Sequence, residues 1–123
     1  MAKNILLVDD EHEIAIVFKT GLAAVGYQVT LAQDAKTGLD QVKQAKFDLI
    51  ILDQMMPDMS GNSVLRILKS ADATKTIPVL MLTNFSQDEL LKEALNLGAS
   101  DYVLKYQVEP KDLVVKVKSL IGE

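Results

Sequence analysis

The sequence predicts an α/β domain: a three-layer, doubly wound structure with five parallel strands in the order 2-1-3-4-5. Short apolar blocks alternate five times with stretches whose apolar residues recur every three or four positions. Four of the five blocks are nearly continuous in apolar residues, as strands covered by helices on both faces must be. Strands and helices that alternate in this way build a parallel sheet with right-handed crossovers.

The five apolar blocks are the predicted strands. They cover residues 4–8, 27–31, 47–52, 77–82 and 101–104. The first three helices are predicted from the spacing of their apolar residues. These residues are Ile14, Phe18, Leu22 and Val25, then Ala35, Leu39 and Val42, then Val64, Leu65 and Leu68. Gly26 follows the first helix, where a helix terminator is expected.

The last two helices have clear start signals. Ser86 and Glu89 form a predicted capping box, in which the two side chains each satisfy a backbone N–H. Gly98 ends that helix, and Pro110 opens the next one at a position that proline tolerates. The residues expected to face the core are Leu90, Leu91, Ala94 and Leu95 in the fourth helix, and Leu113, Val117, Leu120 and Ile121 in the fifth.

Length and composition are those of one globular domain, predicted to span residues 1–123 with no output domain. A formal net charge of −4 and a single arginine, Arg66, argue against direct nucleic-acid binding. The absence of cysteine excludes disulfides, thiolate metal sites and a cysteine nucleophile. The apolar run at residues 5–8 is too short for a signal peptide or a membrane span, so we expect a cytoplasmic protein.

Polar side chains follow four of the five predicted strands. Asp9 and Asp10 follow the first strand, Asp53 the third, Thr83 the fourth and Lys105 the fifth. In an open parallel sheet, ligands bind at the carboxyl ends of the strands, beside the point where the strand order reverses. We therefore expect these carboxylates, the hydroxyl and the ammonium group to meet at one edge of the sheet.

Three carboxylates at close range repel one another, and a single lysine does not neutralise them. A hard divalent cation does, and oxygen ligands are typical of Mg²⁺, with Mn²⁺ as an acceptable substitute. A carboxylate beside Mg²⁺, with Lys105 and Thr83 placed for anionic oxygens, is suited to phosphoryl transfer. The carboxylate itself can be the nucleophile and form an aspartyl phosphate.

Each residue taken alone also has an ordinary explanation. The Asp9–Asp10 pair could cap the first helix, and Asp53 could belong to a turn. Lys105 could be a solvated strand end, and Tyr102 could be a core residue. Their joint occurrence in a fixed order at one sheet edge favours the functional interpretation.

Four segments carry a resemblance to a known family. They read Leu-Val-Asp-Asp-Glu at 7–11, Leu-Asp-Gln-Met-Met-Pro-Asp-Met-Ser-Gly at 52–61, Met-Leu-Thr at 81–83 and Gly-Ala-Ser-Asp-Tyr-Val-Leu-Lys at 98–105. Together they resemble the receiver domain of response regulators in two-component signalling, and in particular the single-domain chemotaxis type. The resemblance covers essentially the whole chain. It implies a flavodoxin-like receiver fold and a signalling switch, not an enzyme.

The resemblance implies a role for each acid. Asp53 would accept a phosphoryl group from a histidine kinase or a histidine phosphotransfer protein. Asp10 and Asp53 would ligate Mg²⁺ directly, Asp9 would hold a metal-bound water, and the backbone carbonyl of Met55 would be a further ligand. No separate organic cofactor is implied.

The resemblance also implies how the signal leaves the site. Thr83 and Lys105 would contact the phosphoryl oxygens, and Tyr102 would turn inward as Thr83 is drawn toward the phosphate. This would change the face made by the fourth helix, fifth strand and fifth helix, which a downstream protein would read. We expect a monomer or a weak phosphorylation-linked dimer, with no direct contact to nucleic acid or membrane.

Four positions depart from the family pattern. Tyr106 stands where proline usually follows the lysine through a cis bond, so we predict a trans Lys105–Tyr106 bond and an altered loop. Met55 and Phe85 are apolar where polar side chains often guide water, which predicts slow autodephosphorylation. Asn84 replaces a usually small residue and is expected to crowd the phosphoryl pocket or hinder Tyr102.

Two other classes of function remain open at this point. An aspartyl-nucleophile phosphatase of similar architecture would need an Asp-x-Asp arrangement after the first strand, whereas Asp9 and Asp10 are adjacent. A receiver-fold interaction module that is not phosphorylated, or a flavodoxin-like flavin binder, would not need the complete acid set. Phosphorylation by a small-molecule donor separates these interpretations.

Overall fold

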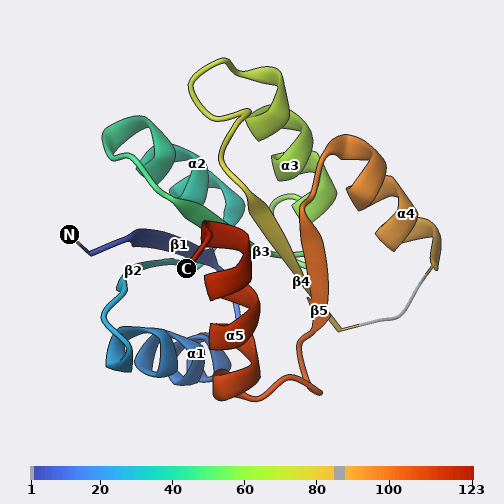
Figure 1. Cartoon of the computed structure of the whole chain (residues 1–123). Coiled ribbons are helices and arrows are strands. Elements are labelled where there is room, and N and C mark those ends of the chain that lie inside the picture. Colours follow the sequence, from blue (N-terminus) through green and yellow to red (C-terminus); the bar gives the residue numbers. More distant parts are fainter. Residues whose placement is uncertain (1, 85–87) are drawn as a thin grey trace.

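The computed structural model describes residues 2–84 and 88–123, which form one parallel sheet with helices on both faces (Figure 1). The elements in chain order are β1 (Asn4–Val8), α1 (His12–Ala24), β2 (Gln28–Ala32), α2 (Ala35–Gln44), β3 (Leu49–Asp53), α3 (Gly61–Ser70), β4 (Val79–Thr83), α4 (Asp88–Leu97), β5 (Asp101–Leu104) and α5 (Pro110–Ile121). The strand order is β2-β1-β3-β4-β5, which confirms the predicted doubly wound topology.

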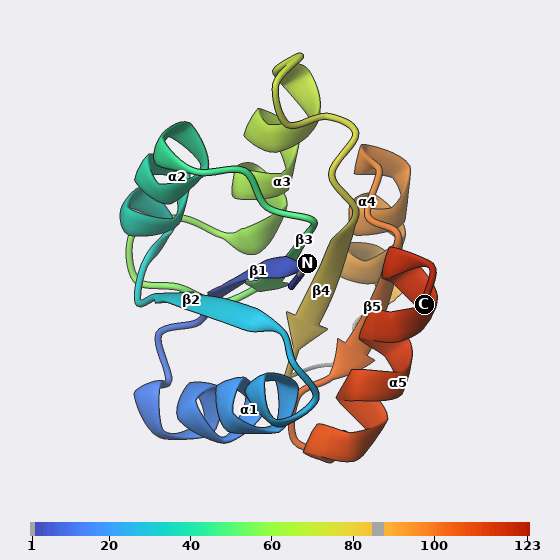
Figure 2. The ribbon, with the colours of Figure 1, turned by 60° about the vertical axis from the view of Figure 1, so that its left-hand side comes forward.

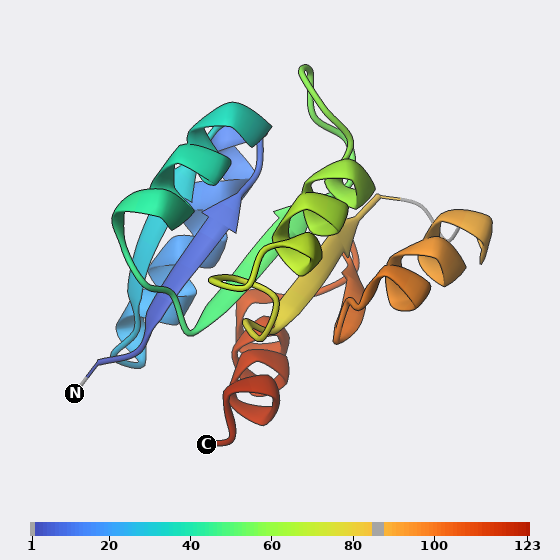
Figure 3. The same cartoon turned by 90° about the horizontal axis from the view of Figure 1, so that it is seen from above.

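The sheet separates two hydrophobic layers. Helices α1 and α5 cover one face, and α2, α3 and α4 cover the other (Figure 2). Alternate strand residues feed the two layers: Ile5 and Leu7 pack toward α1 and α5, whereas Leu6 and Val8 pack toward α2 and α3. Figure 3 shows α2, α3 and α4 side by side over their face of the sheet. Both faces are therefore buried, which is why the strands read as continuous apolar runs.

The ends of β3 and β4 differ from the prediction by one or two residues, and the difference matters for the site. Both ladders begin two residues later than expected, and Pro78, directly before β4, has no N–H to donate to a ladder. Both ladders also end one residue later, at Asp53 and Thr83. These two residues are therefore fixed by the sheet itself.

Two predicted core positions are wrong. Val25 is exposed, because α1 ends at Ala24 and Val25 belongs to the turn that leads into Gly26. Leu95 is exposed as well, while its neighbours Leu91 and Ala94 carry the buried face of α4. The glycine terminators are confirmed, since Gly26 and Gly98 have φ values of 102° and 109°. The predicted Ser86 cap lies outside the described residues.

No cis peptide bond occurs among the described residues, so the predicted trans Lys105–Tyr106 bond is confirmed. No helix in the described ranges is long and apolar enough to span a bilayer.

Candidate functional site

Asp53 lies at the last position of β3, in the middle of the carboxyl edge of the sheet, and only 1% of it is exposed. The chain turns back sharply after it, and the Gly61 N–H donates to the Gln54 carbonyl at 2.8 Å. A Cβ on Gly61 would lie 2.4 Å from the Asp53 carbonyl oxygen, so only glycine fits there. Asp53 is thus a strand residue held against a closed loop, and the turn interpretation is wrong.

Asp9, Asp10 and Asp53 form a cluster in which one carboxylate oxygen from each lies within 4.8 Å of the others. Asp9 is buried and Asp10 is exposed. Asp9 accepts a hydrogen bond from the Glu11 N–H at 2.9 Å, and the N-cap position of α1 is Glu11. The simple helix-capping interpretation of the aspartate pair is therefore wrong, because neither aspartate is the cap residue.

Lys105 carries its ammonium group into this cluster from the end of β5. Its Nζ lies 2.7 Å from Asp9 Oδ1, 2.6 Å from Glu11 Oε1 and 3.4 Å from Asp53 Oδ2. Only 1% of Lys105 is exposed, which rules out a solvated strand end. A buried ammonium is retained because three carboxylates surround it.

The pKa values of these groups reflect their crowding. Burial, followed by the charge of Asp9, raises the pKa of Asp53 to about 7, although Lys105 opposes this shift. Burial alone would lower the pKa of Lys105, but its hydrogen bonds to Asp9 and Glu11 and the charge of Asp53 outweigh burial and raise it. The site therefore disfavours ionisation of Asp53 beside Asp9 unless a further cation binds there.

The cluster fits a hard divalent cation. Asp9 Oδ2 and Asp53 Oδ1 are buried and have no hydrogen-bond partner in the described part of the chain. Buried carboxylate oxygens without partners are costly, and Mg²⁺ coordination satisfies such oxygens while keeping several waters. The all-oxygen set of Asp9, Asp10 and Asp53 suits Mg²⁺.

The remaining predicted residues surround this cluster. Thr83 is buried at the end of β4, next to the strand that carries Asp53. The Lys105 N–H donates to the Thr83 carbonyl at 2.7 Å, which ties β5 to β4 at the site. Tyr102 is 37% exposed, so it is not a core residue, and the side chain of Met55 is exposed as well. Phe85 lies outside the described residues.

Two hydrogen-bonded groups at the site were not predicted from the sequence. The Tyr106 hydroxyl donates to the Glu11 carboxylate, 2.6 Å from Oε1 and 2.5 Å from Oε2. The buried side chain of Gln54 pairs with Asn62 through two hydrogen bonds of 2.8 Å. A polar residue directly after Asp53 in an otherwise apolar environment was the only available signal for the second group.

Asp58 fixes the far side of the loop that follows Asp53. Its carboxylate accepts the N–H groups of Ala35 at 3.1 Å and Lys36 at 3.0 Å, at the start of α2. These hydrogen bonds lower the pKa of Asp58. The loop is therefore attached to a neighbouring helix as well as to the sheet.

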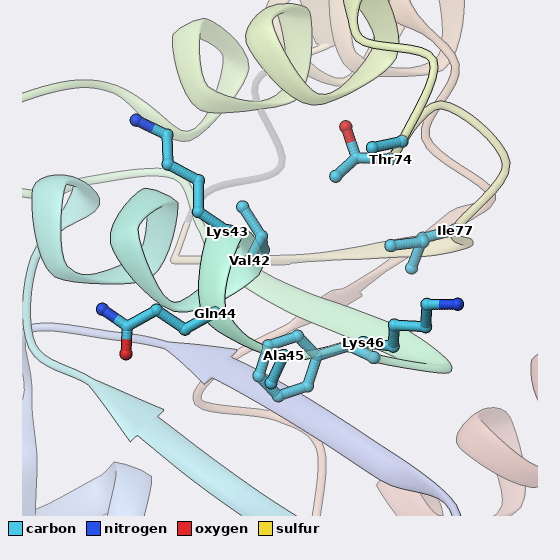
Figure 4. A pocket seen from close by; sticks show the side chains of 9 residues that line it. Val42, Lys43, Gln44, Ala45, Lys46, Thr74 and Ile77 are labelled. Carbon is cyan, nitrogen blue, oxygen red and sulfur yellow. The ribbon is translucent and has the colours of Figure 1, made fainter.

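A hollow in the described residues lies elsewhere (Figure 4). It measures about 580 Å³ and is lined by the end of α2, the following segment to Phe47, and residues Ala73, Thr74 and Ile77. These segments precede β3 and β4, so the hollow lies at the amino edge of the sheet. It contains none of the predicted site residues.

The fold and the carboxyl-edge cluster together define a class of protein. Residues 5–118 match the response regulator receiver domain family, and the chain belongs to that family. Receiver domains are signalling switches of two-component systems, as the resemblance in the sequence implied.

Individual relatives agree with this assignment. The chain is 36% identical over 121 residues to the phosphate regulon transcriptional regulatory protein PhoB of Klebsiella pneumoniae and of Escherichia coli, covering 98% of this chain and 52% of each relative. It thus spans about half the length of these curated relatives. A CheY-like receiver domain protein from Methanospirillum hungatei is 32% identical with a TM-score of 0.92, covering 99% of this chain and 95% of that one.

The chemotaxis response regulator CheY4 of Vibrio cholerae is also similar in structure. It is 29% identical with a TM-score of 0.91, and the match covers 98% of this chain and 99% of that one. The predicted flavodoxin-like receiver fold is therefore confirmed across nearly the whole chain.

Proposed function

We propose that Asp53 accepts a phosphoryl group in the presence of Mg²⁺, and that this modification switches the domain between two signalling states. The observation that carries the proposal is the placement of Asp53. Its Oδ1 is buried without a hydrogen-bond partner among the described residues, its Oδ2 lies 3.4 Å from the Lys105 ammonium, and two further acids adjoin it. This is a carboxylate arranged for attack, with a cation beside it for the transferred charge.

The proposed donor is a phosphohistidine of a histidine kinase or a histidine phosphotransfer protein. An oxygen of Asp53 bonds to phosphorus while the phosphorus–nitrogen bond breaks, and the electron pair leaves with the imidazole, which takes up a proton. Lys105 and the Thr83 hydroxyl would stabilise the phosphoryl oxygens. Mg²⁺, held by Asp10, Asp53, a water on Asp9 and the Met55 carbonyl, would neutralise charge and fix the donor phosphate. Such donors act in the cytoplasm, which is the location that we propose.

Mass spectrometry after incubation with Mg²⁺ and acetyl phosphate tests the acceptor. The wild-type chain should gain the mass of one phosphoryl group, and Asp53→Asn should gain none. Asp58→Asn is the matched control, because it removes a carboxylate from the same loop outside the acid cluster and should still be modified. No mass gain in the wild type would favour an unphosphorylated interaction module, and repeated turnover of a phosphoester would favour a hydrolase.

We propose that the output surface consists of α4, β5 and α5. Leu95, Tyr102 and Val115 are exposed apolar residues on these three elements, which supports contact with a protein partner. Lys116 and Asp101 join β5 to α5 at 2.7 Å, so a change at β5 would reach α5. A downstream protein would read this surface, and the acidic net charge of −4 argues against direct contact with nucleic acid. The domain would be a monomer or a weak phosphorylation-linked dimer.

We also propose slow autodephosphorylation. The exposed apolar Met55 side chain offers no hydrogen bond to an attacking water, and Phe85 has the same chemical character. Phosphate loss from the phosphorylated chain should be faster in Met55→Asn and in Phe85→Glu. Lifetimes equal to that of the wild type would contradict this proposal.

A further inference from the structure

The Lys105 ammonium has no spare hydrogen-bond donor. An ammonium group carries three N–H donors. The three acceptors are Asp9 Oδ1 at 2.7 Å, Glu11 Oε1 at 2.6 Å and Asp53 Oδ2 at 3.4 Å. The shortest contacts are therefore to Asp9 and Glu11, and the longest is to the proposed phosphoacceptor. Phosphorylation of Asp53 would free only the donor that faces it, and Lys105 can approach a phosphoryl oxygen closely only by lengthening one of its two shorter contacts.

Glu11 is the carboxylate that can leave at the lowest cost. The side chain of Asp9 is 0% exposed, so Asp9 would lose its cation in a buried place. The Glu11 side chain is 42% exposed and can be hydrated after it separates from Lys105. It also lies outside the cluster of acids that fits a metal ion.

Tyr106 opposes this release. Its hydroxyl lies 2.6 Å from Glu11 Oε1 and 2.5 Å from Oε2 and shares its single proton between them, so it holds the carboxylate toward Lys105. The Lys105 Nζ also lies 6.0 Å from the centroid of the Tyr106 ring. A phenol, a carboxylate and an ammonium thus form a continuous chain of contacts that ends beside Asp53.

We infer that Tyr106 is a positioning residue that acts through Glu11 to hold Lys105 back from the phosphoryl group, and so weakens phosphoryl binding at Asp53. The inference rests on the proposed function of Asp53. Removal of the Tyr106 hydroxyl leaves every formal charge at the site in place. It frees Glu11 to turn toward solvent, and Lys105 can then move toward Asp53.

Binding of fluoroberyllate, a stable mimic of the phosphoryl group, tests the inference in the presence of Mg²⁺. Tyr106→Phe should bind it about three- to tenfold more tightly than the wild type, the range expected when one hydrogen bond of modest net strength no longer has to be broken. In a Glu11→Gln background, Tyr106→Phe should have no further effect, because the carboxylate through which it acts is gone.

Tyr27→Phe is the matched control. The Tyr27 hydroxyl also donates to a carboxylate, Glu123 Oε1 at 2.6 Å, but Tyr27 lies just before β2, at the amino edge of the sheet. This variant makes the same chemical change and should bind fluoroberyllate like the wild type. Equal or weaker binding by Tyr106→Phe, or an undiminished effect in the Glu11→Gln background, would overturn the inference.

A second measurement does not depend on phosphoryl chemistry. The ¹H–¹⁵N signal of the Lys105 ammonium is recorded in the free protein without metal. In Tyr106→Phe it should shift, and its protons should exchange faster with water, whereas Tyr27→Phe should leave it unchanged. If the wild type bound no fluoroberyllate, the proposed function would fail, and this signal would still decide whether Tyr106 holds Lys105. An unchanged signal in Tyr106→Phe would show that it does not.

Discussion

The side chain of Gln54 and residue Asn62 form a closed pair beside the loop that follows Asp53. Gln54 Nε2 donates to Asn62 Oδ1, and Gln54 Oε1 accepts the Asn62 backbone N–H, each at 2.8 Å. Asn62 Nδ2 reaches further, to the Leu90 carbonyl at 3.3 Å and Glu93 Oε1 at 3.1 Å. The pair thus connects the residue after Asp53 with both α3 and α4.

Replacement of Gln54 by leucine should destabilise the domain. The buried Asn62 N–H and Oδ1 would both lose their partners, and each such loss costs about 1–3 kcal/mol. Urea unfolding should therefore show a loss of about 2–6 kcal/mol in the free energy of unfolding. Gln44→Leu, at an exposed position of α2, is the control and should change this energy by less than about 0.5 kcal/mol. A similar small loss in Gln54→Leu would mean that the pair is not stabilising.

Gly61→Ala should damage the site more than the fold. The added Cβ would lie 2.4 Å from the Asp53 carbonyl oxygen and 2.8 Å from Gln54 Cα, so the backbone of Asp53, the proposed phosphoacceptor, must shift. We expect fluoroberyllate affinity to fall at least about tenfold, since a small misplacement of a reacting group has large effects. Gly26→Ala is the control, because its Cβ meets no atom within 4 Å and only its φ of 102° is unfavourable. It should lower stability and leave fluoroberyllate affinity unchanged.

Asp53→Asn should stabilise the metal-free domain at pH 8. The folded-state pKa of Asp53 is raised to about 7, first by burial and then by the charge of Asp9, above its usual value of 3.8. The fold therefore favours the protonated acid, and wild-type stability declines as the pH rises from about 4 to about 7. Asparagine does not ionise, so the advantage of the variant should be largest at pH 8 and small at pH 4. Urea unfolding with a chelator present measures it.

Asp58→Asn should change the stability of the domain in the opposite direction in the same experiment. The N–H groups of Ala35 and Lys36 lower the pKa of Asp58, so its ionised form favours folding. This variant should be less stable than the wild type at pH 8, and the difference should vanish as the pH falls below the usual range for aspartate. Equal pH profiles for the two variants would contradict the assignment of both shifts.

Mg²⁺ should stabilise the folded chain through the acid cluster. An ion that binds only the native state at a concentration ten times its Kd adds about 1.4 kcal/mol to the free energy of unfolding. Asp10→Asn removes one of the three clustered carboxylates and should lose most of this gain. Asp40→Asn, at an exposed position of α2 outside the cluster, should retain it. Equal stabilisation of both variants would place the ion elsewhere.

Most of the fold could be predicted because its inner strands β1, β3 and β4 are buried on both faces. The predicted strands at 4–8 and 101–104 coincide with β1 and β5, and the order of the sheet follows from the alternation of strands and helices. The start of β4 was displaced because Pro78, directly before it, has no N–H to donate to the ladder. Apolar runs do not contain that information.

The acid cluster could be predicted because topology alone brings strand ends together. The contact between Tyr106 and Glu11 could not, because it joins loops 95 positions apart and depends on the direction of two exposed side chains. The exposure of Val25 likewise depends on where α1 ends, which helical spacing does not specify.

The three carboxylates around Lys105 determine how this edge distinguishes among anions. Because all three ammonium donors are occupied, an incoming anion gains no contact unless it replaces a carboxylate already in place. Weakly basic anions such as chloride or nitrate accept hydrogen bonds less strongly than a carboxylate does, so they have no advantage here. A phosphoryl group attached to Asp53 would be held beside Lys105 by its covalent bond, at a high effective concentration, and would compete with Glu11 for the ammonium. In the resting domain these three carboxylates thus shield the Lys105 ammonium from the surrounding salts.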